Sequence, residues 1–395
     1  MPFIAAFLLG LAMLLPTKGN AQMAAVPACT WRQHANMQPC LQAAINAAAT
    51  SRGTVKIPCG HWLLSKPLLL RSEVSLTGAP GAVLLPTPGN RSNPVLLRGR
   101  GINHVTISGV IFDGGGGNFK NSSPLITITI ANDVTVSGVT VQHARGMGML
   151  LHGGIRNSLV ENSRFIDIGN HWKITHRRAD RLEGLVFCCG DNQNNAAINN
   201  RFQNIGLDAL QMSNQRGFRI IGNHFDLQNQ EGSLLPSPDY PAAMFVQHST
   251  GGLIKDNIID GAPGNGIDAP GLQTTTIEDN QISHCGQAGI GLFQGYDHKT
   301  QTKNIKILNN TLSDNEQWDK GPFKGGLTVG FGSPKNILVE GNRFTNTQAT
   351  KTQKYGVMVV KGTQLHGLQM KGNVFKNNAA GETNFKPGSV LSSAP

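Results

Sequence analysis

The sequence is poor in aromatic and charged residues and has no long apolar run beyond its N-terminus. Of its 395 residues, only 6% are Phe, Trp or Tyr and 14% are Asp, Glu, Lys or Arg. After residue 21 no apolar stretch reaches the roughly 20 residues of a transmembrane helix, so we expect no integral membrane span. The few aromatics and the lack of a helical recognition motif argue against a nucleic-acid partner. No Cys and His spacing matches a zinc site.

The N-terminus has the pattern of a secretory signal. Residues 1–21 contain the apolar run FIAAFLLGLAMLL, then Pro16, then Gly19-Asn20-Ala21 as a small-x-small cleavage site. We therefore expect a periplasmic or secreted protein. Without Lys18 of the signal, the 33 remaining Lys and Arg exceed the 23 Asp and Glu by 10. A basic exported protein favours an acidic partner, such as an acidic polysaccharide or oligosaccharide.

A short phrase returns ten times along the chain. It consists of an apolar residue, two small or polar residues, a position that is usually Asn, any residue and a final apolar residue, as in RIIGNHF (Arg219–Phe225). Steps between copies run from 23 to 37 residues, and the alternating pattern rich in Val, Ile and Thr favours strands. Such repetition indicates a solenoid. The position of the Asn is occupied in turn by Val110, Val139, Ser163, Asn200, Asn223, Asn257, Asn280, Asn310, Asn342 and Asn373.

The repeated Asn has an architectural explanation. Asn tolerates the left-handed backbone conformation and so suits a sharp bend between strands. Asn side chains stacked on successive coils can also bond to one another as a ladder. We therefore expect this column to hold the fold together rather than to perform chemistry.

The segment that precedes the repeats reads CLQAAINAAATSRGTVKIPCGHWLLSKPLLL (Cys40–Leu70). Together with the repeats and the FDGGGGN turn (Phe112–Asn118), it resembles the right-handed parallel β-helix proteins of the pectate lyase and polygalacturonase superfamily. The resemblance implies an all-β, right-handed parallel β-helix of about ten to twelve coils with an N-terminal capping helix. It divides the chain into a signal (1–21), a cap (22–72), the β-helix (73–378) and a polar tail (379–395), and we expect a monomer.

Six cysteines in an exported protein can pair. Cys29, Cys40 and Cys59 lie close together around the cap, and Cys40–Cys59 is the pair we expect first. Cys188 and Cys189 are adjacent. Because neighbouring strand residues point to opposite faces, one should face the core and the other the outside.

A second recurring strand, usually opened by Gly, follows each Asn phrase. Its outward positions are mostly Leu, Val, Gly or Met, so polar exceptions mark a candidate site: Glu183, Asp208, Gln211, Gln247 and Asp268. Glu183 and Asp208 should share a column on adjacent coils, with backbones about 4.8 Å apart. Asp268 should lie two coils beyond Asp208, in the column of third strand positions that runs Gln211, Phe245, Asp268. Carboxylates this close repel unless one is protonated or a cation lies between them. Glu183, Asp208 and Asp268 are therefore a candidate Ca²⁺ site as well.

The three longest steps carry insertions that precede the second strand and should emerge at one edge of it. Long loops in a compact fold are usually functional. With basic residues and aromatics for sugar stacking, they predict a groove for an anionic sugar chain. The candidate substrate-binding residues are Gln211, Gln247, His171, His176, Arg177, Arg178, Tyr240, Trp318 and Lys324.

The resemblance to carbohydrate-active β-helix proteins leaves several reactions open. A polyuronate lyase needs a base and a cation that neutralises the substrate carboxylate, and a glycoside hydrolase needs two carboxylates. The candidate catalytic residues are Asp208, Glu183, Asp268, Lys173 and Arg181. The Asn-Thr-Asp, Gly-His-Gly and Arg-Ile-Lys motifs of polygalacturonases and the Asp-Pro-His-Asp motif of alginate C5-epimerases are absent. A lyase is therefore slightly favoured, ahead of a hydrolase and of a non-catalytic glycan-binding or envelope protein.

Overall fold

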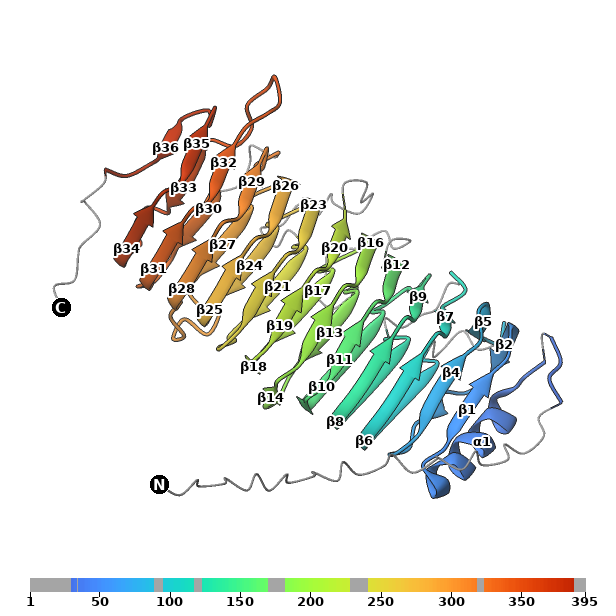
Figure 1. The fold of residues 1–395 in the computed structure, drawn as a ribbon. Helices are drawn as coiled ribbons and strands as arrows, with labels where there is room; N and C mark the ends of the chain where they lie inside the picture. Colours follow the sequence, from blue (N-terminus) through green and yellow to red (C-terminus); the bar gives the residue numbers. More distant parts are fainter. Residues whose placement is uncertain are drawn as a thin grey trace, which may run out of the picture.

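The protein is a stack of short parallel strands with one helix at its N-terminal end (Figure 1). A computed structural model describes residues 30–33, 35–88, 95–116, 123–169, 182–227, 241–317 and 323–386. Each turn of the chain passes through three faces, called A, B and C here, and pairs with the same face of the next turn. One sheet of 24 strands contains faces A and B, and a sheet of 12 strands forms face C. The all-β solenoid expected from the repeats is confirmed.

Face A carries the Gly-opened strands. Its members are β3 (Leu68–Leu69), β6 (Leu97–Ser108), β8 (Ile126–Ser137), β10 (Met149–Arg156), β13 (Leu185–Cys188), β17 (Leu210–Ser213), β21 (Met244–Gln247), β24 (Ile267–Pro270), β27 (Ile290–Phe293), β30 (Gly325–Gly330), β33 (Tyr355–Val359) and β36 (Gly381–Thr383). β6, β8 and β10 continue through the bend onto face B, which joins the two faces into one sheet.

Faces B and C carry the two halves of each Asn phrase. Face B contains β1 (Thr54–Ile57), β4 (Ser75–Gly78), β11 (Leu159–Glu161), β15 (Ala196–Ile198), β19 (Arg219–Ile221), β22 (Leu253–Lys255), β25 (Gln273–Glu278), β28 (Lys303–Leu308), β31 (Lys335–Glu340) and β34 (His366–Lys371), with β14 (Asn192–Gln193) and β18 (Gln215–Arg216) at its bend with face A. Face C contains β2 (Gly60–Leu64), β5 (Ala82–Pro86), β7 (Ile111–Asp113), β9 (Thr140–Gln142), β12 (Arg164–Ile168), β16 (Arg201–Ile205), β20 (His224–Asp226), β23 (Ile258–Ala262), β26 (Gln281–Cys285), β29 (Thr311–Ser313), β32 (Arg343–Thr345) and β35 (Val374–Lys376).

Helix α1 (Gln38–Ser51) lies against the first coil (Figure 1). Pro39 sits in its first turn, where a missing N–H costs nothing. Leu41, Ala44, Ile45 and Ala48 recur at helical spacing and are buried. The Gln42 side chain accepts a hydrogen bond from Leu69 N at 2.7 Å, which ties the helix to β3. Of the helices in the described ranges, none is long and apolar enough to span a membrane.

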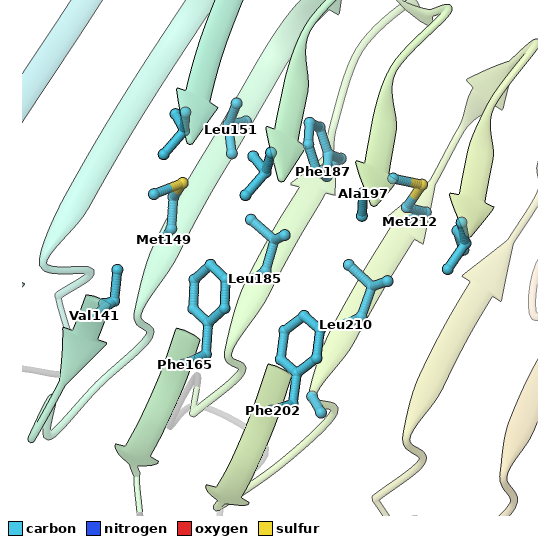
Figure 2. Packing of buried hydrophobic residues seen from close by; sticks show 14 of the residues in the cluster. Val141, Met149, Leu151, Phe165, Leu185, Phe187, Ala197, Phe202, Leu210 and Met212 are labelled. Atoms are coloured by element: carbon cyan, nitrogen blue, oxygen red, sulfur yellow. The ribbon is translucent and has the colours of Figure 1, made fainter. Parts of the chain in front are cut away.

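Inward side chains from all three faces fill the core (Figure 2). Phe165, Phe202 and Phe225 occupy equivalent face C positions on successive coils and stack, with ring centroids 5.0 and 4.7 Å apart. All three are fully buried. Burying a Phe side chain stabilises a fold by about 1.5–3 kcal/mol, so this column alone contributes substantially.

The Asn column forms a buried hydrogen-bonded ladder at the bend between faces B and C. Asn223 N donates to Asn257 Oδ1 at 2.9 Å, and Asn257 N donates to Asn280 Oδ1 at 3.0 Å. The Asn257 amide also donates to the carbonyls of Ile220 and Lys255, both at 2.9 Å. The same pattern runs through Ser163, Asn200, Asn223, Asn257, Asn280, Asn310, Asn342 and Asn373. The predicted ladder is confirmed.

The left-handed backbone lies one residue before the ladder position. Asn199, Asp256 and Asn309 have φ near 55°, and Gly222 has φ of 66° at the equivalent place. Two adjacent residues of the turn therefore share the two roles that we expected of a single Asn. The preceding Asn, Asp or Gly adopts the left-handed conformation. The ladder Asn itself supplies the hydrogen bonds.

The cysteines differ from expectation at the cap. Cys40 is disulfide-bonded, but Cys59 is an exposed free thiol, so the predicted Cys40–Cys59 pair is wrong. Cys59 lies against the next coil, where a Cβ placed on Gly81 would be 3.1 Å from its sulfur. Cys188 and Cys189 are bonded to each other; Cys188 is buried and Cys189 exposed. Cys285 is fully buried, and burial raises the pKa of its thiol.

We predict that Asn257→Ala lowers the free energy of unfolding by more than about 2 kcal/mol, because several buried polar groups lose their partner at about 1–3 kcal/mol each. Denaturant-induced unfolding followed by circular dichroism measures the effect. Asn103→Ala is the matched control, since the Asn103 side chain is exposed at the bend between faces A and B. Equal stability of the two variants would contradict the structural role of the ladder.

We also predict that Cys59 reacts with iodoacetamide in the native protein and that Cys285 reacts only after unfolding. Burial keeps the Cys285 thiol protonated and inaccessible, and the thiolate is the reactive form. Peptide mapping by mass spectrometry distinguishes the two sites. Native labelling of Cys285 at the rate of Cys59 would show that this part of the core opens readily.

Candidate functional site

The outward side of face A changes character in its central coils. Parallel register places Gln211 of β17 beside Phe245 of β21, and Phe245 beside Asp268 of β24. The next partner along this column is Gly291 of β27. The column Gln211, Phe245, Asp268 thus lies as the sequence predicts, with all three side chains partly exposed between buried inward neighbours.

A second polar column lies where the chain enters face A. Gly148 N donates to Glu183 O, and Gly184 N donates to Asp208 O, so Glu183 and Asp208 occupy equivalent positions on adjacent coils as expected. The Glu183 side chain is 7% exposed. The Asp208 carboxylate accepts a hydrogen bond from Ala242 N at 2.8 Å, on the next coil. This contact gives Asp208 a structural role in addition to any chemical one.

Asp268 does not lie in the same column as the other two acids. Ala209 N donates to Ala242 O and Ala243 N to Asn265 O, so Asn265 occupies the Asp208 column two coils further on. Asp268 is three residues beyond Asn265 along the strand. Within the described ranges, no three His, Cys, Asp or Glu side chains are grouped closely enough to hold a metal ion. The Ca²⁺ site expected at Glu183, Asp208 and Asp268 therefore stays a prediction.

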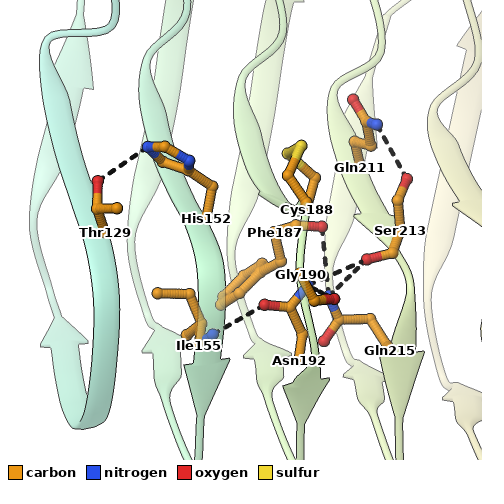
Figure 3. Close-up of a disulfide and its surroundings, with 11 residues drawn as sticks. Thr129, His152, Ile155, Phe187, Cys188, Gly190, Asn192, Gln211, Ser213 and Gln215 are labelled. Carbon is orange, nitrogen blue, oxygen red and sulfur yellow. Dashed lines mark hydrogen bonds between the residues drawn. A yellow bond between two sulfur atoms is a disulfide. The ribbon is translucent and has the colours of Figure 1, made fainter.

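A small apolar cluster borders this region on the N-terminal side. Met147, Leu150, Val186 and Cys188 pack together separately from the main core. Figure 3 shows Cys188 on β13 between His152 on β10 and Ser213 on β17. His152 Nε2 is 2.9 Å from Thr129 Oγ1, and Gln211 Nε2 donates to Ser213 Oγ at 2.9 Å. The disulfide-bonded pair thus forms part of an apolar wall beside Gln211.

A loop on the C-terminal side of this region folds back toward the central coils. Residues 294–301 follow β27, and Asp297 organises them by accepting hydrogen bonds from Lys299 N at 3.0 Å and from Thr300 N at 2.8 Å. The Thr300 hydroxyl also donates to Asp297 at 2.6 Å, and these bonds hold the pKa of the carboxyl well below its usual range. The loop is therefore a defined structure rather than a loose connection.

This loop, named the return loop here, contacts the coil of β21, two turns earlier. His248 Nε2 is 3.5 Å from Asp297 Oδ1, an ionic contact when the imidazole is protonated and long for a hydrogen bond. The imidazole occupies the space beside Gly295, where any Cβ would collide with it. Tyr296 stacks on Phe245, with ring centroids 6.0 Å apart and planes 19° apart. The return loop therefore bridges the coil that carries Asp268.

An aromatic cluster lies on the C-terminal side of Asp268. The Phe293 ring of β27 packs on Phe323 and Phe331, with centroids 4.6 and 5.9 Å away. Gly291 makes room for this ring, because any Cβ there would collide with Phe293. Asp268 is thus flanked along the solenoid axis by the Phe245–Tyr296 pair and by this cluster.

Lys324 lies in a buried ionic cluster. Its Nζ is 3.8 Å from Glu316 Oε1, and Lys354 Nζ is 3.6 Å from the same oxygen. Lys354 N donates to the other Glu316 oxygen at 2.9 Å. The Glu316 side chain is only 2% exposed, so it holds both ammonium groups at the edge of face A. Lys324 contacts Glu316, and its expected role in substrate binding stays a prediction.

The other candidate residues lie outside the described residues. They are Lys173, Arg181, His171, His176, Arg177, Arg178, Tyr240 and Trp318. Gln247 lies on β21 with its side chain partly exposed, and Gln211 is next to Phe245. Of the predicted set, the structure brings Gln211, Gln247 and Asp268 together around Phe245.

The sequence analysis missed the return loop and the Phe cluster. The loop falls in a step of 30 residues, which is ordinary for this chain, so length gave no signal. Phe245 and Phe293 were grouped with the apolar residues that dominate the outward positions. A usable signal was present: aromatic residues make up 6% of the chain, yet Phe245, Phe293 and Tyr296 lie in outward strand positions or just after them.

The arrangement suits recognition of a sugar chain. Amides of Gln211 and Gln247 and the Asp268 carboxylate can bond to hydroxyl groups. Flanking aromatic rings can pack on the apolar faces of rings in a ligand. Few polar groups set among aromatic ones are typical of ligand sites that fix orientation.

Several solved structures are similar in fold to this chain. The A-module of the Azotobacter vinelandii mannuronan C-5 epimerase AlgE6 superposes with a TM-score of 0.67 at 18% identity, covering 91% of this chain and 96% of the module. The Streptococcus pneumoniae surface adhesin PfbA gives 0.66 at 17% identity, covering 87% of this chain and 90% of the adhesin. The tailspike of E. coli bacteriophage HK620, in complex with a pentasaccharide, gives 0.59 at 16% identity, covering 87% and 64%. At these identities the likeness shows the fold alone. No curated protein matches the sequence.

A family model adds evidence from the sequence itself. The model described as the right handed beta helix region matches residues 170–344 and 242–391. The two matches overlap and together cover more than half of the 395 residues. The expected superfamily is thereby confirmed, and the chain belongs to the right-handed β-helix family.

Proposed function

We propose that this protein is an exported enzyme that acts on a uronate-containing polysaccharide and cleaves it by β-elimination. The observation that carries the proposal is the central part of face A. There Gln211, Gln247 and Asp268 surround Phe245 on a surface otherwise built from glycine and apolar residues. A few polar groups set among apolar and aromatic side chains are typical of a site that binds and orients a ligand.

The structural neighbours support a glycan as the partner. One is an epimerase that acts at C-5 of mannuronan, and another is a tailspike solved with a pentasaccharide. Epimerisation at C-5 and β-elimination both begin with removal of the C-5 proton of a uronate. The net positive charge of this chain favours a polyanion such as a polyuronate.

The proposed reaction removes the C-5 proton, which is acidic because it lies next to the carboxylate. A base accepts this proton, a double bond forms between C-4 and C-5, and the bond from C-4 to the glycosidic oxygen breaks. The leaving oxygen takes a proton. A cation paired with the substrate carboxylate stabilises the charge that develops on it.

Residue roles follow from residue type and position. We assign Lys173 and Arg181, which lie outside the described residues, to the base and to the cation beside the substrate carboxylate. We assign Asp268, Gln211 and Gln247 to hydroxyl groups of the sugar bound on face A. Glu183 and Asp208 border the site at the strand entrances, and Asp208 also holds Ala242 in place.

Two other functions use the same surface. A glycoside hydrolase would use Asp268 with Glu183 or Asp208 as its carboxylate pair. A non-catalytic binder is favoured by the adhesin among the structural neighbours. The assay below separates all three.

We predict that polygalacturonate or alginate incubated with the protein gains ultraviolet absorbance from a C-4=C-5 double bond conjugated with the carboxylate. Parallel samples with added Ca²⁺ or with EDTA test the calcium expectation. New reducing ends without the absorbance would favour hydrolysis instead. Binding without either product would favour a non-catalytic protein.

We predict that Asp268→Ala lowers kcat/KM about tenfold to 100-fold, because it removes a charged hydrogen-bond partner of a sugar hydroxyl, which contributes about 1.5–3 kcal/mol. Asp208→Ala should abolish turnover because it removes the hydrogen bond that positions Ala242 at the entrance of the site, and it should lower the unfolding midpoint as well. Asp226→Ala is the control, because this carboxylate lies on face C. Full activity of Asp268→Ala would remove Asp268 from the site.

A further inference from the structure

We propose that the aromatic side chains on either side of Asp268 form two stacking positions for pyranose rings, so that a bound glycan runs along the solenoid axis across β21, β24 and β27. The proposal deepens the proposed function, since it concerns how the same site holds its substrate.

The first position is made by Phe245 and Tyr296. Phe245 is the register partner of Asp268, so its ring lies one strand away on the same surface. Tyr296 reaches back from the return loop to stack on it, and 55% of the Tyr296 side chain is exposed. The contact of His248 with Asp297 holds the loop in this orientation. The Tyr296 ring therefore remains accessible although it belongs to an ordered loop.

The second position is made by Phe331 with Phe323 and Phe293. Phe323 and Phe331 meet edge to face, with centroids 6.1 Å apart and planes at 82°. Phe293 is almost fully buried beneath them and forms their base, whereas Phe331 is 47% exposed. The base sits over Gly291, which is the register partner of Asp268 on the opposite side from Phe245.

Phe331 is held in an unfavourable backbone conformation. Its φ of 60° is left-handed, which is a rare state for a bulky residue that cannot bond its own backbone. Its N–H donates to Thr363 Oγ1 at 3.0 Å on the next coil. Cys189, Asn214 and His248 end earlier strands of face A in the same way and have φ of 60°, 56° and 47°, so the bend itself imposes this state. The bend therefore places the exposed Phe331 ring at the edge of face A.

The chemistry between the two positions favours a sugar over a purely apolar ligand. The ring C–H groups of a pyranose present apolar faces that can pack on aromatic rings, and its hydroxyl groups need polar partners at the edges. Asp268 supplies an acceptor between the aromatic groups, and Gln247 supplies donors and an acceptor two residues along β21 from Phe245. An apolar peptide would cover these polar groups without offering them hydrogen bonds, at a cost.

The experiment compares Tyr296→Ala, Phe331→Ala and Tyr296→Phe with the wild type. Isothermal titration calorimetry measures Kd for oligogalacturonate, oligomannuronate and a carboxyl-reduced neutral form of each. We expect each Ala variant to raise Kd about fivefold to tenfold for the acidic oligomer that binds and for its neutral form. Tyr296→Phe should bind like the wild type. Val374→Ala is the control, because Val374 is 43% exposed on face C.

The outcomes separate this proposal from the proposed reaction. Weaker binding in both Ala variants, with no turnover by the wild type, would support the stacking positions and overturn the lyase. Turnover with the KM of the Ala variants unchanged would overturn the stacking positions and leave the reaction standing. Equal weakening in Val374→Ala, or binding of an apolar peptide in preference to every oligosaccharide, would also overturn the stacking positions.

Discussion

A hydrogen bond that recurs from Ser163 to Asn373 underlies the geometry of most of the stack. The side-chain carbonyl of a buried Asn accepts the backbone N–H of the equivalent residue on the preceding coil, as Asn257 does for Asn223. Because this bond is possible only when the two bends lie directly above one another, it fixes the register of face B and of face C at once. Register on face A follows, and it brings Gln211, Phe245 and Asp268 into one row. The site is therefore a product of the ladder, although no ladder residue touches it.

The coils of the fold and one row of the candidate site could be predicted by counting residues. The recurring Asn predicts the coils, and the alternation of the Gly-opened strand predicts the row of Gln211, Phe245 and Asp268. The separation of Asp268 from the column of Asp208 was harder to predict. It depends on Asp268 lying three residues further along its strand, which the coil number does not show. The Cys40–Cys59 pair failed for a related reason: Cys59 contacts the neighbouring coil at Gly81, and sequence proximity to Cys40 says nothing about that.

What the sequence could not reveal is contact between coils that are not neighbours. Repeat reasoning assumes that each coil meets only the ones before and after it. The return loop breaks this assumption, since Tyr296 and Asp297 meet Phe245 and His248 two turns earlier. Nothing in the spacing distinguishes such a loop from a solvated one. Asp191, by contrast, forms ion pairs with adjacent coils, with Arg156 on the preceding coil and Arg216 on the following coil.

The return loop also bears on how such a molecule can change in length. A solenoid can gain or lose a whole coil by duplication or deletion, because the new neighbours offer the same ladder bond and the same core. Between β21 and β27 this freedom is lost, since an added coil would separate Phe245 from Tyr296 and His248 from Asp297. Length variation among related chains should therefore be concentrated at other points of the stack. The interval around Asp268 should keep a constant number of turns.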